Sequence, residues 1–350
     1  MRNLMIYGAY GYTGELIVRA AVERGHQPII AGRSEGKLLP LAEELLLDYR
    51  AFNAEDAAEH LADVGTVLNC AGPFSRTAAP LVAACLDRKT HYVDITGEIP
   101  VFSHCHDLDE AARQAGVILC PGAGFDIVPT DCLAASLKER LPNAETINLA
   151  FSFGTKPSIG TAKTTLEALE HGGLVRRDHK LEQVGNAYDI RKIPFPEGDR
   201  WAATIPWGDV FTSGVSTGVP NGMVYAALPR SLAIAMRLAS PFRGLLGKDS
   251  VKKRLEKMVE ARFAGGPDDE ARSEQRTEFW GEAIAPDGER VALSFSAPNV
   301  YSLTVDTAVE IAAWCQAQSG ASGYATASMI MGADFITTRP GVSAMKEPPS

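Results

Sequence analysis

The sequence lacks several features that mark whole classes of protein. Its six cysteines, at positions 70, 85, 105, 120, 132 and 315, include no CxxC pair, so neither a disulfide framework nor a redox motif is indicated. No segment offers the roughly 18 consecutive apolar residues of a membrane-spanning helix, and the apolar run at 1–7 is too short for a signal peptide. The net charge is −9, which disfavours nucleic-acid binding. We therefore expect a soluble cytoplasmic protein with free thiols.

Short apolar runs alternate with amphipathic helical patterns over the first third of the chain. Strands are expected at 4–7, 28–31, 49–52, 66–69, 92–95 and 117–120, and helices at 13–24, 34–46, 77–88 and 103–115. Because strands and helices alternate, the pattern predicts a doubly wound parallel sheet with helices on both faces.

The alternation of strand and helix patterns ends near residue 140. Strands are expected at 146–153 and 223–228, and a Pro-Asp-Gly turn at 286–288 joins two further runs into a hairpin, 276–285 with 290–297. Strands that are not separated by helices favour antiparallel pairing. We predict an α/β fold with a Rossmann domain at 1–140 and a mixed, largely antiparallel substrate and dimerisation domain at 141–303. A last helix is expected at about 304–318.

A glycine-rich loop follows the first predicted strand and opens the first predicted helix. Gly8 permits a tight turn, Gly11 lets the backbone approach a pyrophosphate, and Gly14 lets helix and strand pack closely. The helix N-terminus then offers N–H groups and a positive dipole end to the phosphates. The expected cofactor contacts in this loop are Gly8, Tyr10, Gly11, Tyr12, Thr13 and Gly14.

The second predicted strand ends in Arg33 and Ser34, where an NAD enzyme usually places an acidic residue for the ribose 2′-hydroxyl. A guanidinium suits a 2′-phosphate, so we predict NADP as the cofactor. The alternative is that Arg33 is a solvated surface residue and Glu35 binds the ribose of NAD.

With these motifs the chain resembles the saccharopine dehydrogenase-like oxidoreductases, in particular the branch with the mycobacterial trans-acting enoyl reductases. The matching stretches lie at 8–14, 31–33, 69–74, 91–98, 121–126, 128–132, 160–164, 206–209 and 217–221. The resemblance implies a Rossmann domain, a mixed second domain, and a C-terminal segment, 304–350, that returns to the first domain.

Three motifs lie after predicted strands of the first sheet, where a doubly wound fold binds its ligands. They add Cys70, Ala71, Gly72, Pro73, Phe74, Thr96 and Gly97 to the expected cofactor contacts. Reduction of a conjugated C=C bond also needs a proton donor, and we consider Tyr92, Asp126 and Lys163. Each has a structural alternative, because Tyr92 could be a core residue, Asp126 a helix cap and Lys163 a solvated helix residue. No metal site is expected.

These observations leave three hypotheses about function. The first is an NADPH-dependent reductase of an enoyl or related lipid-like substrate, the second a saccharopine-type reductase of an amino-acid imine, and the third a non-catalytic NADP-binding scaffold or sensor. We also expect a homodimer.

A basic stretch at 230–257 stands out in this acidic chain. It holds eight Lys and Arg residues against Asp249 and Glu256, interleaved with large apolar residues. Such a pattern fits a helix that docks on an anionic membrane surface or an acyl carrier, or an ordinary amphipathic helix with a solvated basic face.

Overall fold

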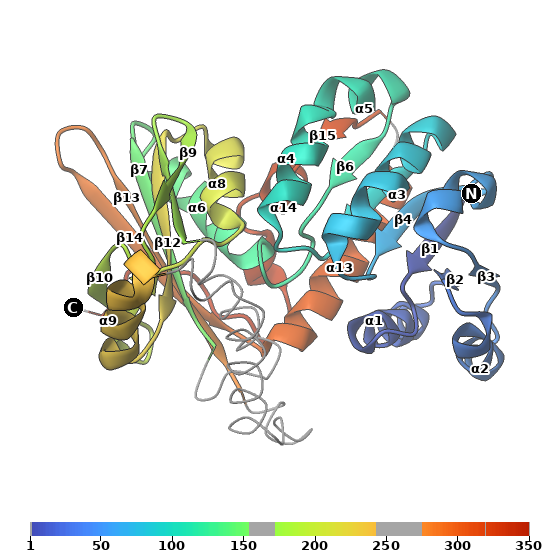
Figure 1. Cartoon of the computed structure of the whole chain (residues 1–350), viewed down its shortest axis with the longest axis horizontal. Coiled ribbons are helices and arrows are strands. Elements are labelled where there is room, and N and C mark those ends of the chain that lie inside the picture. Colours follow the sequence, from blue (N-terminus) through green and yellow to red (C-terminus); the bar gives the residue numbers. More distant parts are fainter. Residues whose placement is uncertain (1, 154–171, 243–274, 319, 350) are drawn as a thin grey trace. The chain divides into compact units, whose positions relative to one another are not determined.

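The computed structural model describes residues 2–153, 172–242, 275–318 and 320–349. It divides the chain into two compact units, Met1–Val128 with Tyr301–Gly332, and Pro129–Val300 with Ala333–Ser350. The first unit carries a parallel sheet and the second a mixed sheet (Figure 1). The α/β fold class predicted from the sequence is confirmed.

The first unit is built on a seven-stranded, entirely parallel sheet in the order β15-β6-β5-β4-β1-β2-β3. Its strands are β1 Asn3–Tyr7, β2 Ile29–Gly32, β3 Tyr49–Ala51, β4 Val64–Asn69, β5 His91–Asp94, β6 Ile118–Cys120 and β15 Gly323–Tyr324. Its longer helices are α1 Tyr12–Glu23, α2 Glu35–Leu45, α3 Phe74–Arg88, α4 Ile99–Asp107, α5 Asp109–Ala115 and α13 Val300–Ala317. The strand order reverses between β1 and β4, and this switch point is where such sheets bind their ligands.

All six strands expected in this part of the chain are present. Five of them are short, largely buried apolar runs. Met5 and Ile6 of β1, for example, are fully buried, whereas β3 is not buried and lies at the edge of the sheet. One expected helix, 103–115, is wrong in extent. The structure has α4 and α5 instead, because Pro100 starts α4 early in its first turn and the backbone leaves the helical region at Leu108.

The second unit is built on an eight-stranded sheet whose main path is β10-β11-β12-β7-β13-β14, with β8 and β9 attached at β12. The strands are β7 Thr146–Ser152, β8 Gly173–Arg177, β9 Lys180–Val184, β10 Ile190–Phe195, β11 Gly198–Thr204, β12 Asn221–Ala227, β13 Thr277–Ile284 and β14 Arg290–Ala297. Every pairing is antiparallel except that of β12 with β7. The predicted hairpin is β13 with β14, joined across the expected turn.

The β10–β11 hairpin ends the main path of this sheet, and β10 also contacts β13. Ile193 and Phe195 of the hairpin share an apolar cluster with Tyr225 and Trp280 of the sheet. Arg191 of β10 also forms an ion pair with Glu282 of β13, with 2.7 Å between Nη1 and Oε1. The hairpin therefore closes one side of the second core.

The limits of the two units differ from the expected boundaries at 140 and 303. Helix α6, Val128–Arg140, lies in the second unit from Pro129 onward. Gly281 of β13 leaves room there, since a Cβ on it would lie 2.8 Å from Leu137 of α6. Within 304–350, α13 and β15 lie in the first unit, whereas residues 333–350 lie in the second, where the Lys346 amide donates to the Ser294 carbonyl of β14.

Candidate functional site

The glycine loop between β1 and α1 has the geometry of a nucleotide cradle. Gly8 adopts φ +83°, and a Cβ on it would lie 2.7 Å from the Ala71 amide nitrogen, so the loops after β1 and β4 touch at this residue. A Cβ on Gly14 would lie 2.2 Å from the Gly8 carbonyl oxygen, which explains the close packing of helix on strand.

Gly11 differs from the other two glycines of the loop. A Cβ on it would approach only the Gly8 carbonyl oxygen, at 3.3 Å. Gly11 is also the N-cap of α1, and no side chain caps that helix end. A helix N-terminus without a side-chain cap, beside a glycine that the fold itself does not require, fits a bound pyrophosphate.

The end of β2 carries the residues that would meet the adenosine ribose. Gly32 accommodates the Tyr10 ring, because a Cβ there would lie 2.7 Å from Tyr10 Cε1. The Lys37 ammonium lies 5.5 Å from the centre of the same ring. Arg33 is exposed, and the Glu35 carboxylate accepts a hydrogen bond from the Tyr49 hydroxyl at 2.9 Å. Glu35, the acidic alternative for ribose binding, thus already accepts one hydrogen bond, whereas the Lys37 cation lies near the Tyr10 ring.

Sequence reasoning missed Lys37. It lies in the first turn of α2, and Arg33 directly precedes the N-cap of the same helix, Ser34. Two cations close in sequence around this helix start favour a 2′-phosphate over a bare ribose hydroxyl.

We expect Arg33→Ala to weaken NADPH binding about tenfold or more, because one charge-assisted contact to phosphate contributes about 1.5–3 kcal/mol. NADH binding should hardly change, since NADH lacks that phosphate. Fluorescence titration with both cofactors measures this, with Glu35→Gln as the control. Loss of NADH affinity in Glu35→Gln, with NADPH affinity unchanged in Arg33→Ala, would contradict the assignment.

A buried hydrogen-bond network joins the loops after β4, β5 and β6. Asp94 accepts from the amides of Thr96 and Gly122 at 3.0 and 2.8 Å, and from the Tyr92 hydroxyl at 2.8 Å. The Tyr92 hydroxyl in turn accepts from Asn69 Nδ2 at 3.1 Å. Burial raises the pKa of Asp94 to about 6, so the carboxylate is ionised at neutral pH. The network holds the three ligand-binding loops in one arrangement.

This network bears on Tyr92, one of the three proton donors considered. Its side chain is fully buried, and its hydroxyl proton is already donated to Asp94. Burial also raises the Tyr92 pKa well above its usual value. The geometry favours a positioning role for Tyr92, and its catalytic assignment stays a prediction.

The loop 70–74 is fixed by an acidic residue that sequence reasoning did not assign to it. The Glu98 carboxylate accepts hydrogen bonds from the Phe74 and Ser75 amides at 2.9 and 2.8 Å, so it caps the start of α3. Burial raises the pKa of the Cys70 thiol, and the nearby Asp94 charge adds to the effect. A thiol that stays protonated is a poor nucleophile. Cys70 is therefore expected only to line the predicted cofactor site.

Asp126 lies in the loop between β6 and α6, against the loop that follows β5. A Cβ on Gly97 would lie 2.8 Å from Asp126 Oδ2, so this glycine makes room for the carboxyl group. Burial raises the Asp126 pKa to about 7. The neighbouring Phe125 amide donates to Thr304 Oγ1 of α13 at 3.0 Å, so it is not available to a substrate carbonyl. The third donor considered, Lys163, lies outside the described residues.

Comparison with known proteins agrees with this geometry. Residues 4–120 match the family model of the saccharopine dehydrogenase NADP binding domain. This part of the chain is therefore similar to a known NADP-binding domain. The resemblance to this family and the NADP cofactor predicted from the sequence are thus confirmed.

Two curated relatives illustrate the similarity. A trans-acting enoyl reductase of Mycobacterium ulcerans (strain Agy99) is 32% identical over 159 residues, which cover 42% of this chain and 38% of that protein. A saccharopine dehydrogenase-like oxidoreductase of Rattus norvegicus is 28% identical over 228 residues, 57% of this chain and 52% of that protein. The aligned region thus spans about half or less of these relatives.

A solved structure matches the whole chain. The apo saccharopine dehydrogenase (L-Glu forming) of Saccharomyces cerevisiae aligns with a TM-score of 0.68 over 99% of both chains, at 12% sequence identity. The two proteins therefore share a fold across both units.

Proposed function

We propose that this protein is an NADPH-dependent reductase of a C=C bond conjugated to a carbonyl, as in an enoyl thioester. The observation that carries the proposal is Asp126, a carboxyl group with a pKa of about 7 placed against Gly97 in the same unit as the NADP-binding loop. A group with this pKa can hold a proton at neutral pH and release it during a reaction.

The chemistry divides between the cofactor and the chain. NADPH, when bound, supplies a hydride to the β-carbon. The Asp126 carboxyl gives its proton to the α-carbon, so that one O–H bond breaks and one C–H bond forms, and the carboxylate regains a proton from solvent. The network of Asn69, Tyr92 and Asp94 holds the loops around this point. The curated relatives named trans-acting enoyl reductases support this substrate class.

The test is NADPH oxidation by an enoyl thioester, followed against pH. Because Asp126 must carry a proton to donate it, kcat should fall as the pH rises through about 7. Asp126→Asn should lower kcat about 100-fold and abolish that pH dependence, with NADPH affinity unchanged. Tyr92→Phe is the matched comparison, and it should keep the pH dependence because its hydroxyl only orients Asp94.

Other results would favour the alternatives. If Tyr92→Phe loses the pH dependence and Asp126→Asn keeps it, the proton donor is Tyr92. Oxidation of saccharopine with NADP in place of enoyl reduction would identify the amino-acid imine reaction. Tight NADPH binding with no turnover of either substrate would identify a scaffold or sensor.

A further inference from the structure

Helix α9, Arg230–Ala239, is anchored to the second sheet by one side and by both of its arginines. Ala233 and Met236 are buried in a cluster with residues of the β10–β11 region. Arg237 donates from Nε to the Ala187 carbonyl at 2.8 Å and from Nη2 to the Tyr188 carbonyl at 2.9 Å. The Arg230 guanidinium lies 4.6 Å from the centre of the Trp201 ring of β11. These contacts hold the helix in a defined orientation.

The opposite side of α9 is apolar and exposed. Leu232, Ile234 and Leu238 are 46%, 41% and 70% exposed. The remaining exposed positions of the helix, apart from the two arginines, are Ser231 and Ala235. The outward side therefore carries no charge, which is unusual for a helix on a protein surface and marks a site of interaction.

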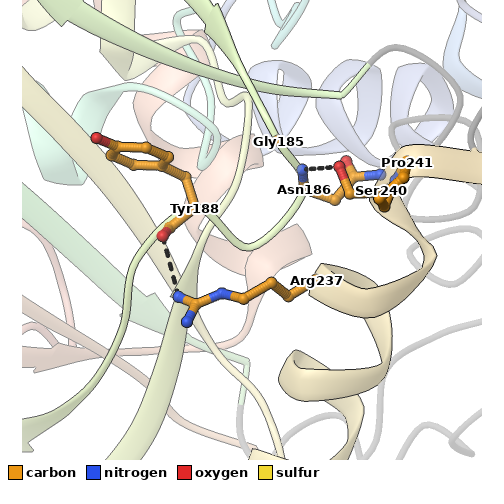
Figure 2. Close-up of a pocket in the computed structure, with 6 residues that line it drawn as sticks. All are labelled: Gly185, Asn186, Tyr188, Arg237, Ser240 and Pro241. Atoms are coloured by element: carbon orange, nitrogen blue, oxygen red, sulfur yellow. Dashed lines mark hydrogen bonds between the residues drawn. The ribbon is translucent and has the colours of Figure 1, made fainter.

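A groove of about 590 Å³ lies beside the helix (Figure 2). It is lined by Gly185, Asn186, Tyr188, Arg237, Ser240 and Pro241. Two hydrogen bonds hold its lining residues in place. The Asn186 amide donates to Ser240 Oγ at 2.8 Å, and Arg237 donates to the Tyr188 carbonyl. Among the described residues, Arg237 forms no ion pair with a carboxylate, and its hydrogen bonds to the two carbonyls use Nε and Nη2.

We propose that α9 is a membrane-contact helix whose aliphatic side enters the interface of an anionic phospholipid bilayer while Arg237 binds a headgroup phosphate in the adjoining groove. Charge complementarity favours this partner. The sequence from 230 to 257 holds eight basic and two acidic residues in a chain of net charge −9. The exposed leucine and isoleucine side chains suit the acyl-chain region of a bilayer. The guanidinium beside them suits the phosphates of the headgroup layer.

This inference is independent of the proposed reaction, because it concerns a surface of the second unit. In the part of the chain that the structure describes, no helix is both long and apolar enough to cross a bilayer. The contact would therefore be peripheral and reversible, as a helix lying in the interface plane is.

Flotation of the full chain with lipid vesicles tests the proposal. The protein should float with vesicles of phosphatidylcholine and phosphatidylserine, and not with phosphatidylcholine alone. Binding should weaken at high salt, because exposed charges are screened beyond about 8–10 Å. Inorganic phosphate at the same phosphate concentration should not release the protein, since it offers no apolar layer.

Variants separate the two parts of the contact. Leu232→Ser with Leu238→Ser should reduce vesicle affinity at least ~30-fold, because two leucine side chains no longer enter the apolar layer. The matched control is Leu46→Asn with Leu181→Ser, which removes two leucines that are 87% and 38% exposed elsewhere and should leave binding unchanged. Arg237→Gln should reduce the preference for phosphatidylserine, and its thermal unfolding shows whether the fold persists.

Several outcomes would overturn the proposal. The parent protein could fail to bind anionic vesicles. The control variant could lose as much vesicle affinity as the leucine variant, or inorganic phosphate alone could release the protein from the vesicles. Binding of an acidic carrier protein in place of vesicles would also overturn it. So would a dimer that dissociates in the leucine variant without any vesicle binding, because α9 would then join two copies of this chain. Turnover of a soluble thioester should be the same in all these variants, so this test and that of the reaction fail separately.

Discussion

Gly11→Val is expected to abolish NADPH binding while the protein stays folded. The Gly11 backbone, with φ −74° and ψ 157°, is one that any residue adopts, and a Cβ there approaches only the Gly8 carbonyl oxygen, at 3.3 Å. A branched side chain would instead fill the space that the pyrophosphate takes. We expect an affinity loss of at least ~100-fold, or ~2.7 kcal/mol, by fluorescence titration.

Gly14→Ala is the matched contrast in the same loop. Its Cβ would lie 2.2 Å from the Gly8 carbonyl oxygen, so backbone must shift and the thermal unfolding temperature should fall. A folded Gly11→Val protein that binds NADPH normally would show that the loop is only a turn.

Arg176→Met is expected to cause the largest loss of stability. Arg176 of β8 is 4% exposed and donates to the Val210 and Val219 carbonyls and to Ser213 Oγ. Burial lowers its pKa to about 10, which still leaves the guanidinium charged at neutral pH. Its removal leaves three buried oxygen atoms without this hydrogen-bond donor, and each buried acceptor left unsatisfied costs about 1–3 kcal/mol of stability. Urea denaturation should show a loss of about 3–5 kcal/mol.

The next residue provides the control for this prediction. Arg177 is exposed and pairs with Glu182 at the surface, so Arg177→Met should change stability little. Gly214→Ala should mimic Arg176→Met in part, because its Cβ would lie 2.8 Å from Arg176 Cδ. Equal losses for the two arginines would show that burial of Arg176 contributes nothing special.

Two of the strands that sequence reasoning missed, β8 and β9, share a physical cause. The hairpin of β8 and β9 turns through Asp178 and His179, both at positive φ, without the glycine that normally signals such a turn. β9 is exposed along nearly its whole length, so no alternation of apolar and polar residues marks it. Both strands depend on pairing within the second sheet rather than on local pattern.

For the basic stretch at 230–257, too, the sequence showed the composition but not the arrangement of the side chains. Its charge and apolar content were plain from the sequence, whereas residues 243–257 of it lie outside the described residues. Within the described part, Arg237 is exposed but also anchored, because it donates to two carbonyls of the loop 187–188. Which side of α9 faces outward depended on those contacts.

The sequence by itself determined the Rossmann sheet, its glycine loop and the NADP preference. These features depend on short segments whose spacing and side chains dictate local geometry. Only the tertiary structure showed which polar groups lie together around the candidate site. Glu98 caps α3 from another loop, Lys37 lies near the Tyr10 ring, and Asp126 lies against Gly97. Such contacts, and the pKa values that burial produces, arise only where distant segments meet in the fold.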